Sequence, residues 1–282
     1  MRNVSLVVKG RHALVAPLLA VALAAPGAGA EPLAQVPPGS VVRWSGEGIE
    51  SCVMEERSCA PLDGACFYAV DLLRGEGSVD LVRTRGGQRE SVSVRVGAYH
   101  YPVQKLTLPK EKVDLSPESL ARVRRESREI GQLWGRTGER RFTLPLHPPL
   151  DPLPEGGRFG SRRIINGQPK SPHSGADYTA AAGEPILAAA DGVVALADDH
   201  FFAGQSVFLD HGDGLISMYF HMSRVDVERG ESVRRGQVIG EVGSTGRVTG
   251  PHLHFGLRWH RARIDPALLL GAPGGLPEIR IR

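Results

Sequence analysis

The first distinct hydrophobic segment is residues 13–25, which are almost all apolar and follow a start containing three basic residues. Residues 28–30 (Ala-Gly-Ala) then offer a small-x-small cleavage site, so the pattern is typical of a secretory signal peptide. The run is too short for a comfortable membrane span, and no later segment reaches eighteen apolar residues. We predict that residues 1–30 are a signal peptide. The mature protein is then exported, to the periplasm or the extracellular space, with no membrane span.

Residues 31–112 have a β-like pattern after a Pro-rich start at residues 31–40. Polar and apolar residues alternate loosely over residues 78–83 and strictly over residues 91–96, and Gly86-Gly87 lies between the two stretches. Alternation with period two predicts strands, and a Gly pair between them predicts a hairpin. We expect a small β-rich N-terminal module here.

A single helix is predicted within residues 113–155. Ser116 is a good N-cap, Pro117 suits the first helical position and Glu118 lies in the first turn. A partial apolar stripe and many alternating charges follow, and these favour a solvated, salt-bridged helix. The apolar positions are Leu120, Val123, Ile130 and Leu133. With the Pro-rich stretch at residues 147–154, this region is interpreted as a helix and a linker.

From residue 156 to residue 270 the chain consists of short apolar runs separated by Gly turns. Turn dipeptides suited to hairpins occur at Asn166-Gly167, Asp191-Gly192 and Asp213-Gly214. Many short strands with almost no helix predict a compact antiparallel β-sheet or sandwich. The chain is therefore expected to be mainly β, with a C-terminal tail at residues 271–282.

Composition excludes some partners. The formal net charge is +3, but the predicted signal peptide contains three basic residues and no acidic ones, so the rest has 31 basic and 31 acidic residues. A nucleic-acid partner, which needs a basic face, is not supported.

Cys52, Cys59 and Cys66 allow one disulfide and leave one thiol, and the sequence does not choose the pairing. A site of three thiolates is disfavoured, because export favours oxidation.

Seven of the ten histidines follow residue 170. His252 and His254 are two apart, so in a strand their side chains project from the same face. His173 and Asp177 are four apart, which also returns to one face of an extended segment. His, Asp and His are ligand types that zinc accepts, with a fourth position left for water. We predict that His173, Asp177 and His254 hold one zinc ion.

Hydrolysis at such a site needs groups that move protons. Imidazole titrates near neutrality, so His221 and His252 are the candidate catalytic residues. His211, between Asp210 and Gly212, is expected at a hairpin tip. His200 and His260 have no matching partner and are expected at the surface. Each motif is weak by itself, and their joint occurrence in one Gly-rich β domain carries the prediction.

Seven motif blocks occur in order between residues 156 and 270, with Asp265-Pro266 near the end. They are Phe159 to Arg163, Pro172 to Tyr178, Ala190 to Val194, His211 to Gly214, Tyr219 to Met222, Gly240 to Gly246 and Gly250 to Phe255. Together they resemble the lysostaphin/LytM-type M23 zinc peptidases. The resemblance implies a β-sheet groove, peptidoglycan as substrate, zinc ligands at His173, Asp177 and His254, and catalytic histidines at His221 and His252. Met222 stands where leucine is common in that family.

Three functions are compatible with these predicted site residues and with the family resemblance. The first is a zinc-dependent endopeptidase that cuts peptide cross-links or stem peptides of peptidoglycan. The second is a non-catalytic wall-binding or amidase-activating protein on the same fold, which the complete residue set argues against. The third is a periplasmic metal-binding protein without hydrolysis. The bond that is cut, an amidase or divisome partner, the oligomeric state and an inhibitory role for the N-terminal module stay open.

Overall fold

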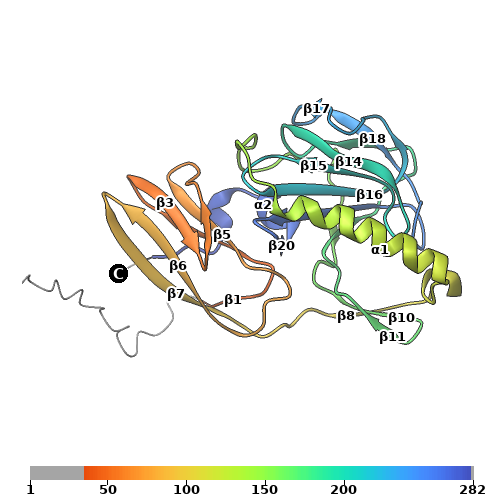
Figure 1. Cartoon of the computed structure of the whole chain (residues 1–282), viewed down its shortest axis with the longest axis horizontal. Coiled ribbons are helices and arrows are strands. Elements are labelled where there is room, and N and C mark those ends of the chain that lie inside the picture. Colours follow the sequence, from red (N-terminus) through yellow and green to blue (C-terminus); the bar gives the residue numbers. More distant parts are fainter. Residues whose placement is uncertain (1–34, 281–282) are drawn as a thin grey trace, which may run out of the picture. The chain divides into compact units, whose positions relative to one another are not determined.

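The structure is a computed structural model that describes residues 35–280, and strands supply most of its regular structure (Figure 1). The predicted signal peptide lies outside the described residues. Within residues 35–280, no helix combines the length and apolar character that a membrane crossing requires.

The first part of the described chain forms two small sheets. A five-stranded sheet has the order β1-β7-β6-β3-β4, and a separate pair joins β2 to β5. The predicted hairpin at Gly86-Gly87 is confirmed, since β6 and β7 pair antiparallel across it. The bounds are β1 Gln35–Val36, β2 Val41–Ser45, β3 Ile49–Met54, β4 Arg57–Cys59, β5 Ala65–Ala69, β6 Gly77–Arg85 and β7 Gln88–Val96.

A disulfide joins Cys52 to Cys66 in the buried cluster between these sheets. This settles the pairing that the sequence left open. Cys59 is the free thiol. Burial, together with the charge of Asp213, raises the pKa of Cys59 to about 12, so the group stays a neutral thiol at physiological pH. A site of three thiolates is therefore not formed.

A three-stranded sheet follows, with the order β11-β10-β8. Its strands are β8 (Val103–Leu106), β10 (Arg162–Ile165) and β11 (Gln168–Lys170). Asn166 and Gly167 have φ values of 50° and 79°, the left-handed region that a two-residue type I′ turn requires, and β10 and β11 pair across them. The sequence prediction of a hairpin at this dipeptide is confirmed.

The largest sheet has ten strands, and all of its pairs are antiparallel. Its main path is β17-β14-β15-β16-β19-β12-β9; β18 joins β16 and β13, and β20 joins β19. The bounds are β9 Gly156–Gly157, β12 Gly175–Tyr178, β13 Pro185–Leu187, β14 Gly192–His200, β15 Gly204–Asp210, β16 Leu215–Val225, β17 Ser232–Val233, β18 Val238–Val242, β19 Leu253–Trp259 and β20 Ala262–Ile264. The antiparallel β prediction is confirmed.

One turn expectation was wrong. Asp191-Gly192 does not close a hairpin, because β13 pairs with β18 while β14 pairs with β15 and β17. Gly192 instead allows close packing, since a Cβ there would lie 2.8 Å from His211 Nδ1 and 2.8 Å from the Asp210 carbonyl oxygen. This glycine therefore lets the start of β14 pack closely against Asp210 and His211.

Helix α1 (Pro117–Gly131) begins where the sequence predicts. Ser116 caps it by accepting a hydrogen bond from the Ser119 backbone N–H. No residue of α1 is fully buried. The following 3₁₀ helix η2 (Gln132–Gly135) buries Leu133, and Ile130 and Trp134 pack with it against β14, β15 and β16. In Figure 1 the helix runs along these strands. The solvated linker helix is therefore docked at its C-terminal end.

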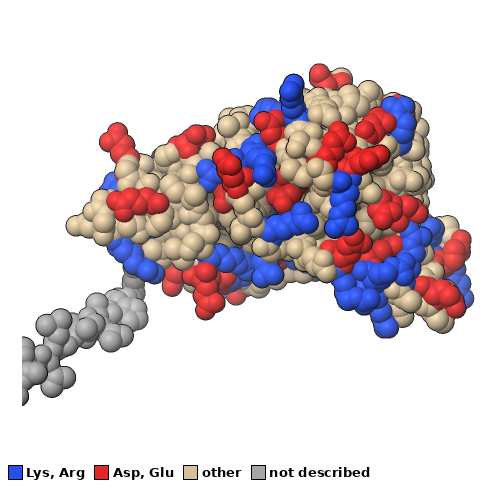
Figure 2. Space-filling model, turned by 45° about the horizontal axis from the view of Figure 1, so that its top comes forward, with Lys and Arg blue, Asp and Glu red and all other residues tan. Residues whose placement is uncertain are grey.

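The Pro-rich stretch at residues 147–154 and the segment just before it are also packed. Phe142, Leu146 and Leu150 are at most 5% exposed and belong to the same buried cluster as the residues of the ten-stranded sheet. Short helices complete the chain: η1 (Lys110–Lys112), α2 (Pro266–Leu270) and η3 (Pro273–Gly275). On the face shown in Figure 2, acidic and basic side chains are interspersed.

His211 should make folding stability depend on pH. It is fully buried, its Nδ1 lies 2.7 Å from the Asp191 carbonyl oxygen and its Nε2 lies 2.7 Å from Ser217 Oγ. Burial lowers its pKa from 6.5 to about 4, so between these values only the unfolded chain takes up the proton. Stability is full above pH 6.5 and falls as the pH drops toward 4, by about 3 kcal/mol from this residue.

The measurement is urea unfolding of the protein and of His211→Asn at pH 7 and pH 4.5. Asn keeps a donor for the Asp191 carbonyl oxygen but does not titrate, so the variant should lose less stability across this interval. Equal losses in both proteins would show that His211 does not contribute to the pH dependence.

Candidate metal and catalytic site

Strand register brings three of the predicted residues together. Asp177 on β12 lies directly opposite His254 on β19, and β19 also pairs with β16, where Phe220 is opposite His254. His173 precedes β12, and its backbone N–H donates to the Ser161 carbonyl oxygen. The antiparallel register therefore fixes the site on the neighbouring strands β12 and β19 of the ten-stranded sheet.

The candidate ligand atoms form a small triangle. His173 Nε2 lies 2.9 Å from Asp177 Oδ1, His254 Nδ1 lies 2.9 Å from the same oxygen, and the two nitrogens are 2.8 Å apart. For comparison, two ligand atoms bound to one tetrahedral zinc ion through bonds of about 2.0–2.1 Å lie about 3.3 Å apart. His173 Nδ1 lies 2.9 Å from the Arg158 carbonyl oxygen; donating its proton there leaves Nε2 free to bind a metal. Three lone pairs can thus converge on one point.

Packing holds His254 in place. Phe220 stacks on its ring with centroids 5.1 Å apart. On the other side, a Cβ at Gly175 would lie 2.6 Å from His254 Nε2, closer than real contacts allow. Only glycine fits at residue 175, which explains why a glycine lies between His173 and Asp177 in the sequence.

Asp177 is held as a carboxylate. Burial by itself raises its pKa, but the close contacts with the rings of His173 and His254 outweigh burial, and the net pKa lies far below the usual range. Its second oxygen, Oδ2, accepts a hydrogen bond of 3.3 Å from the Arg163 guanidinium. The carboxylate therefore presents one oxygen to the histidines and the other to an arginine.

The two candidate catalytic histidines lie beside this triangle. Their rings are 4.9 Å apart, and His252 Nε2 is 3.7 Å from Asp177 Oδ1. Their Nδ1 atoms lie 2.9 Å from backbone carbonyl oxygens, that of Thr245 for His221 and that of Gly250 for His252. A carbonyl only accepts, so both Nδ1 atoms carry the proton and both Nε2 atoms are free to accept one. The structure brings all five predicted residues together.

His221 has an unusual backbone. It lies within β16, where the pairing with β15 shifts register, and its φ is +68°. A non-glycine residue in this region is strained, and bulges commonly redirect a side chain next to a functional site. Burial and the neighbouring rings of His254 and His252 lower the pKa of His221 to about 3, so it is neutral at pH 7.

Two cavities border the cluster. The first, of about 460 Å³, is lined by Asp177, His221 and His252 together with residues of β8 and β10. The second, of about 310 Å³, is lined by His173, His221 and His254 together with residues of α1 and η2. Arg163 and Arg247 line both. A substrate in either cavity would reach the candidate ligands.

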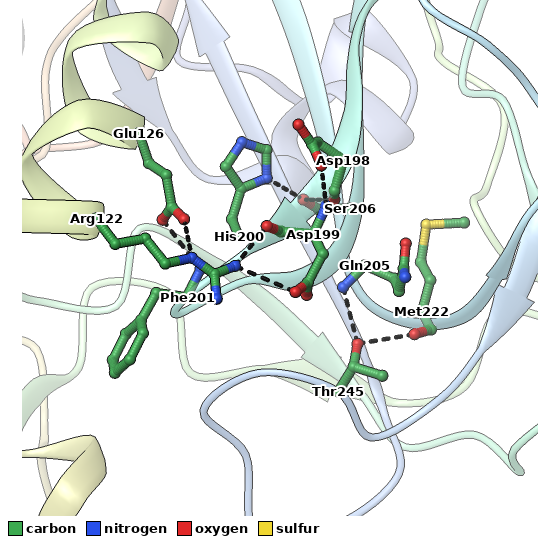
Figure 3. Close-up of polar contacts among 10 residues, drawn as sticks. All are labelled: Arg122, Glu126, Asp198, Asp199, His200, Phe201, Gln205, Ser206, Met222 and Thr245. Atoms are coloured by element: carbon green, nitrogen blue, oxygen red, sulfur yellow. Dashed lines mark hydrogen bonds and ion pairs between the residues drawn. The ribbon is translucent and has the colours of Figure 1, made fainter. Parts of the chain in front are cut away.

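A polar network connects α1 with the turn between β14 and β15 (Figure 3). Glu126 accepts a hydrogen bond from the Phe201 backbone N–H, and Arg122 bonds Asp199. Beyond the turn, the Gln205 backbone N–H donates to Thr245 Oγ1, which in turn donates to the Met222 carbonyl oxygen. Because the Thr245 carbonyl oxygen also lies against His221, the two hydrogen bonds of the Thr245 hydroxyl support the strained histidine.

Replacing Thr245 should therefore reduce catalysis through His221. Thr245→Val keeps the side-chain shape but removes both hydrogen bonds of the hydroxyl. We expect kcat to fall about ten- to a hundredfold, the effect of a small displacement of a reacting group, with little change in KM. Thr245→Ser keeps the hydroxyl and should retain most activity. A Val variant with unchanged kcat would show that this network does not position His221.

The other histidines correct the sequence expectations. His200 and His260 were expected at the surface, but His200 is 4% exposed and bonds Ser206, and His260 is only partly exposed beside Asp213. His211 is adjacent to the turn between β15 and β16 as expected, yet it is fully buried. The sequence reasoning also overlooked Arg163, Arg247 and Thr245 as site residues, since spacing within one strand gives no signal for them.

Comparison with known proteins identifies the family. The sequence profile of peptidase family M23 matches residues 171–266, which include all five site residues. A solved structure from Pseudomonas aeruginosa that carries the name peptidase M23 is 32% identical, with a TM-score of 0.64, and the match covers 83% of this chain and 95% of that one. The fold and these matches thus define a member of a peptidase family. The chain belongs to peptidase family M23.

Curated relatives match a shorter part. Peptidoglycan DD-endopeptidase ShyC of Vibrio cholerae is 44% identical over 127 residues, which are 44% of this chain and 29% of the relative. Peptidoglycan DD-endopeptidase ShyA of the same organism is 45% identical over 87 residues, 31% of this chain and 20% of the relative. The chain therefore spans less than a third of the length of these two relatives.

Proposed function

We propose that this protein is a zinc-dependent endopeptidase that hydrolyses peptide cross-links or stem peptides of bacterial peptidoglycan. One observation carries the proposal: three convergent ligand atoms lie beside two further histidines whose Nδ1 atoms face backbone carbonyl oxygens. The names of the curated relatives support peptidoglycan as the substrate.

The residues fit a zinc ion. Two neutral imidazoles and one carboxylate are a common set for a catalytic zinc site, which keeps an open position. His173, Asp177 and His254 would hold the ion. When bound, zinc would lower the pKa of water to about 7 and polarise the scissile carbonyl. Arg163 would keep Asp177 oriented through the second carboxylate oxygen.

The roles of the other two histidines follow from their tautomers. His221 and His252 both line the cavity of about 460 Å³, and each holds its Nδ1 against a backbone carbonyl oxygen, which leaves Nε2 as the nitrogen for proton transfer. One of them can accept the proton of the attacking water, and as an imidazolium the other can donate to the oxygen or the leaving amine. Holding both Nδ1–H groups on backbone carbonyls prevents the rings from turning away.

Export is part of the proposal. Peptidoglycan lies outside the cytoplasmic membrane, and the signal peptide predicted at residues 1–30 would take the chain there. The disulfide between Cys52 and Cys66 is consistent with an oxidising compartment such as the periplasm.

The experiment uses purified residues 31–282. The protein should contain about one zinc per chain and should release soluble muropeptides from purified peptidoglycan. Mass spectrometry of the products from defined cross-linked muropeptides would identify the bond that is cut. A zinc-free preparation that is inert after zinc is added would reject the proposal.

A further inference from the structure

The guanidinium of Arg247 lies beside the site and is stacked on an aromatic ring. Its backbone N–H donates to the Phe202 carbonyl oxygen, and its guanidinium stacks on the Phe202 ring with 4.1 Å between Cζ and the ring centroid. Among residues 35–280 no carboxylate forms an ion pair with it. Stacking holds the flat face of the guanidinium, while the N–H groups at its edge stay available.

The surroundings make this charge costly. Arg247 is partly buried, and burial and the nearby charge of Arg163 both lower its pKa. Arginine does not lose its proton in proteins, so an unpaired guanidinium in a cavity wall is destabilising until an anion arrives. Asp177 is occupied by Arg163 and the histidines. Glu155 lines the same cavity but forms no ion pair with Arg247 within residues 35–280, so an anion from outside the chain can supply the missing partner.

The position of Arg247 identifies where that partner binds. It lines both cavities beside the candidate catalytic residues His221 and His252. Arg158 and Arg163 line the first cavity as well, against Glu155 and Asp177 as its acidic residues. A cation at the ligand triangle would make this region more positive still. The groove is suited to a peptide that carries a negative charge next to the bond being cut.

We infer that Arg247 is a specificity-determining residue, which binds a free carboxylate on one of the two residues flanking the scissile peptide bond. A guanidinium edge and a carboxylate pair through two parallel hydrogen bonds. This inference rests on the proposed function and names a feature of its substrate. The alternative role for Arg247 is purely structural, in which its stacking on Phe202 only stabilises the turn between β14 and β15.

The test compares synthetic cross-linked peptides that differ only in one group. One carries free carboxylates on both residues flanking the scissile bond, and the others have one of these carboxylates converted to an amide. The protein should cleave the free acid with a kcat/KM about 10- to 100-fold higher than one of the amides, the range expected for one charge-assisted pair. Which amide is the poor substrate shows the side of the bond that Arg247 contacts.

Variants assign this preference to the residue. Arg247→Ala should cleave the acid and both amides at nearly equal rates, and Arg247→Lys should keep part of the preference, because a lysine ammonium retains the charge without the paired geometry. Arg162→Ala is the matched control. Arg162 stacks on Tyr99 in a similar way, at 5.1 Å, but does not line the first cavity. This variant should keep the full preference, and thermal melts establish that each variant is folded.

The outcomes are separable. If the protein cleaves acid and amides equally well, the inference is wrong while the proposed function stands. If Arg247→Ala slows all substrates by the same factor, Arg247 only supports the turn. If Arg247→Ala does not fold, Arg247→Lys becomes the test. If Arg247→Lys keeps the full preference for the acid over the amides, Arg247 does not bind the carboxylate through two parallel hydrogen bonds. A protein that cleaves none of the peptides overturns both the proposed function and this inference.

Discussion

His254→Ala is expected to abolish zinc binding and hydrolysis together. The variant removes one of three ligand atoms, and the remaining two would leave the ion held by a single imidazole and one carboxylate oxygen. A bound metal supplies several kcal/mol of transition-state stabilisation, so activity should fall at least about a thousandfold. Metal content by mass spectrometry and muropeptide release measure the two effects on the same preparation.

His100→Ala is the control for this prediction. His100 is exposed, lies outside the ligand triangle and stacks on Tyr101. It should retain zinc and activity. A His254→Ala protein that still holds about one zinc per chain would mean that the ligand set is wrong, and retained activity without metal would mean that the chemistry is wrong.

Strand periodicity explains how much of the fold could be predicted. The stretch from Ser91 to Val96 alternates strictly and forms part of β7, and Asn166-Gly167 closes the hairpin that its φ preferences require. The Pro-rich stretch could not be interpreted in this way. Phe142, Leu146 and Leu150 are evenly spaced, but they lie outside any helix or strand, and their burial depends on a sheet that the chain forms much later. A spacing in a segment without regular structure does not predict which distant segment it packs against.

The same limit applies to the site. Ligand type, spacing and the family resemblance nominated His173, Asp177 and His254, and the structure brings them together because Asp177 and His254 lie on strands that pair directly. His200 was assigned to the surface because its partners, Ser206 and Phe208, lie across a turn. Arg247 lies in a loop where neither alternation nor helical spacing applies, so only the folded structure reveals that it faces the cavities.

His252→Ala should separate metal binding from catalysis. His252 is not a member of the ligand triangle, and its Nε2 lies 3.7 Å from Asp177 Oδ1. The variant should keep about one zinc per chain while kcat falls about 10²- to 10⁴-fold, the usual contribution of a general acid or base. Metal content and single-turnover rates on a defined cross-linked peptide are the measurements.

This variant also decides among the three functions considered from the sequence. A protein that only binds metal would have no hydrolysis rate to lose, and a wall-binding or amidase-activating protein would support cell separation equally well with His252→Ala. His221→Ala should behave like His252→Ala, because both rings present a free Nε2 from a carbonyl-anchored Nδ1. Loss of zinc in either variant would instead place that histidine among the ligands, since a proton-transfer residue can be removed without releasing the ion.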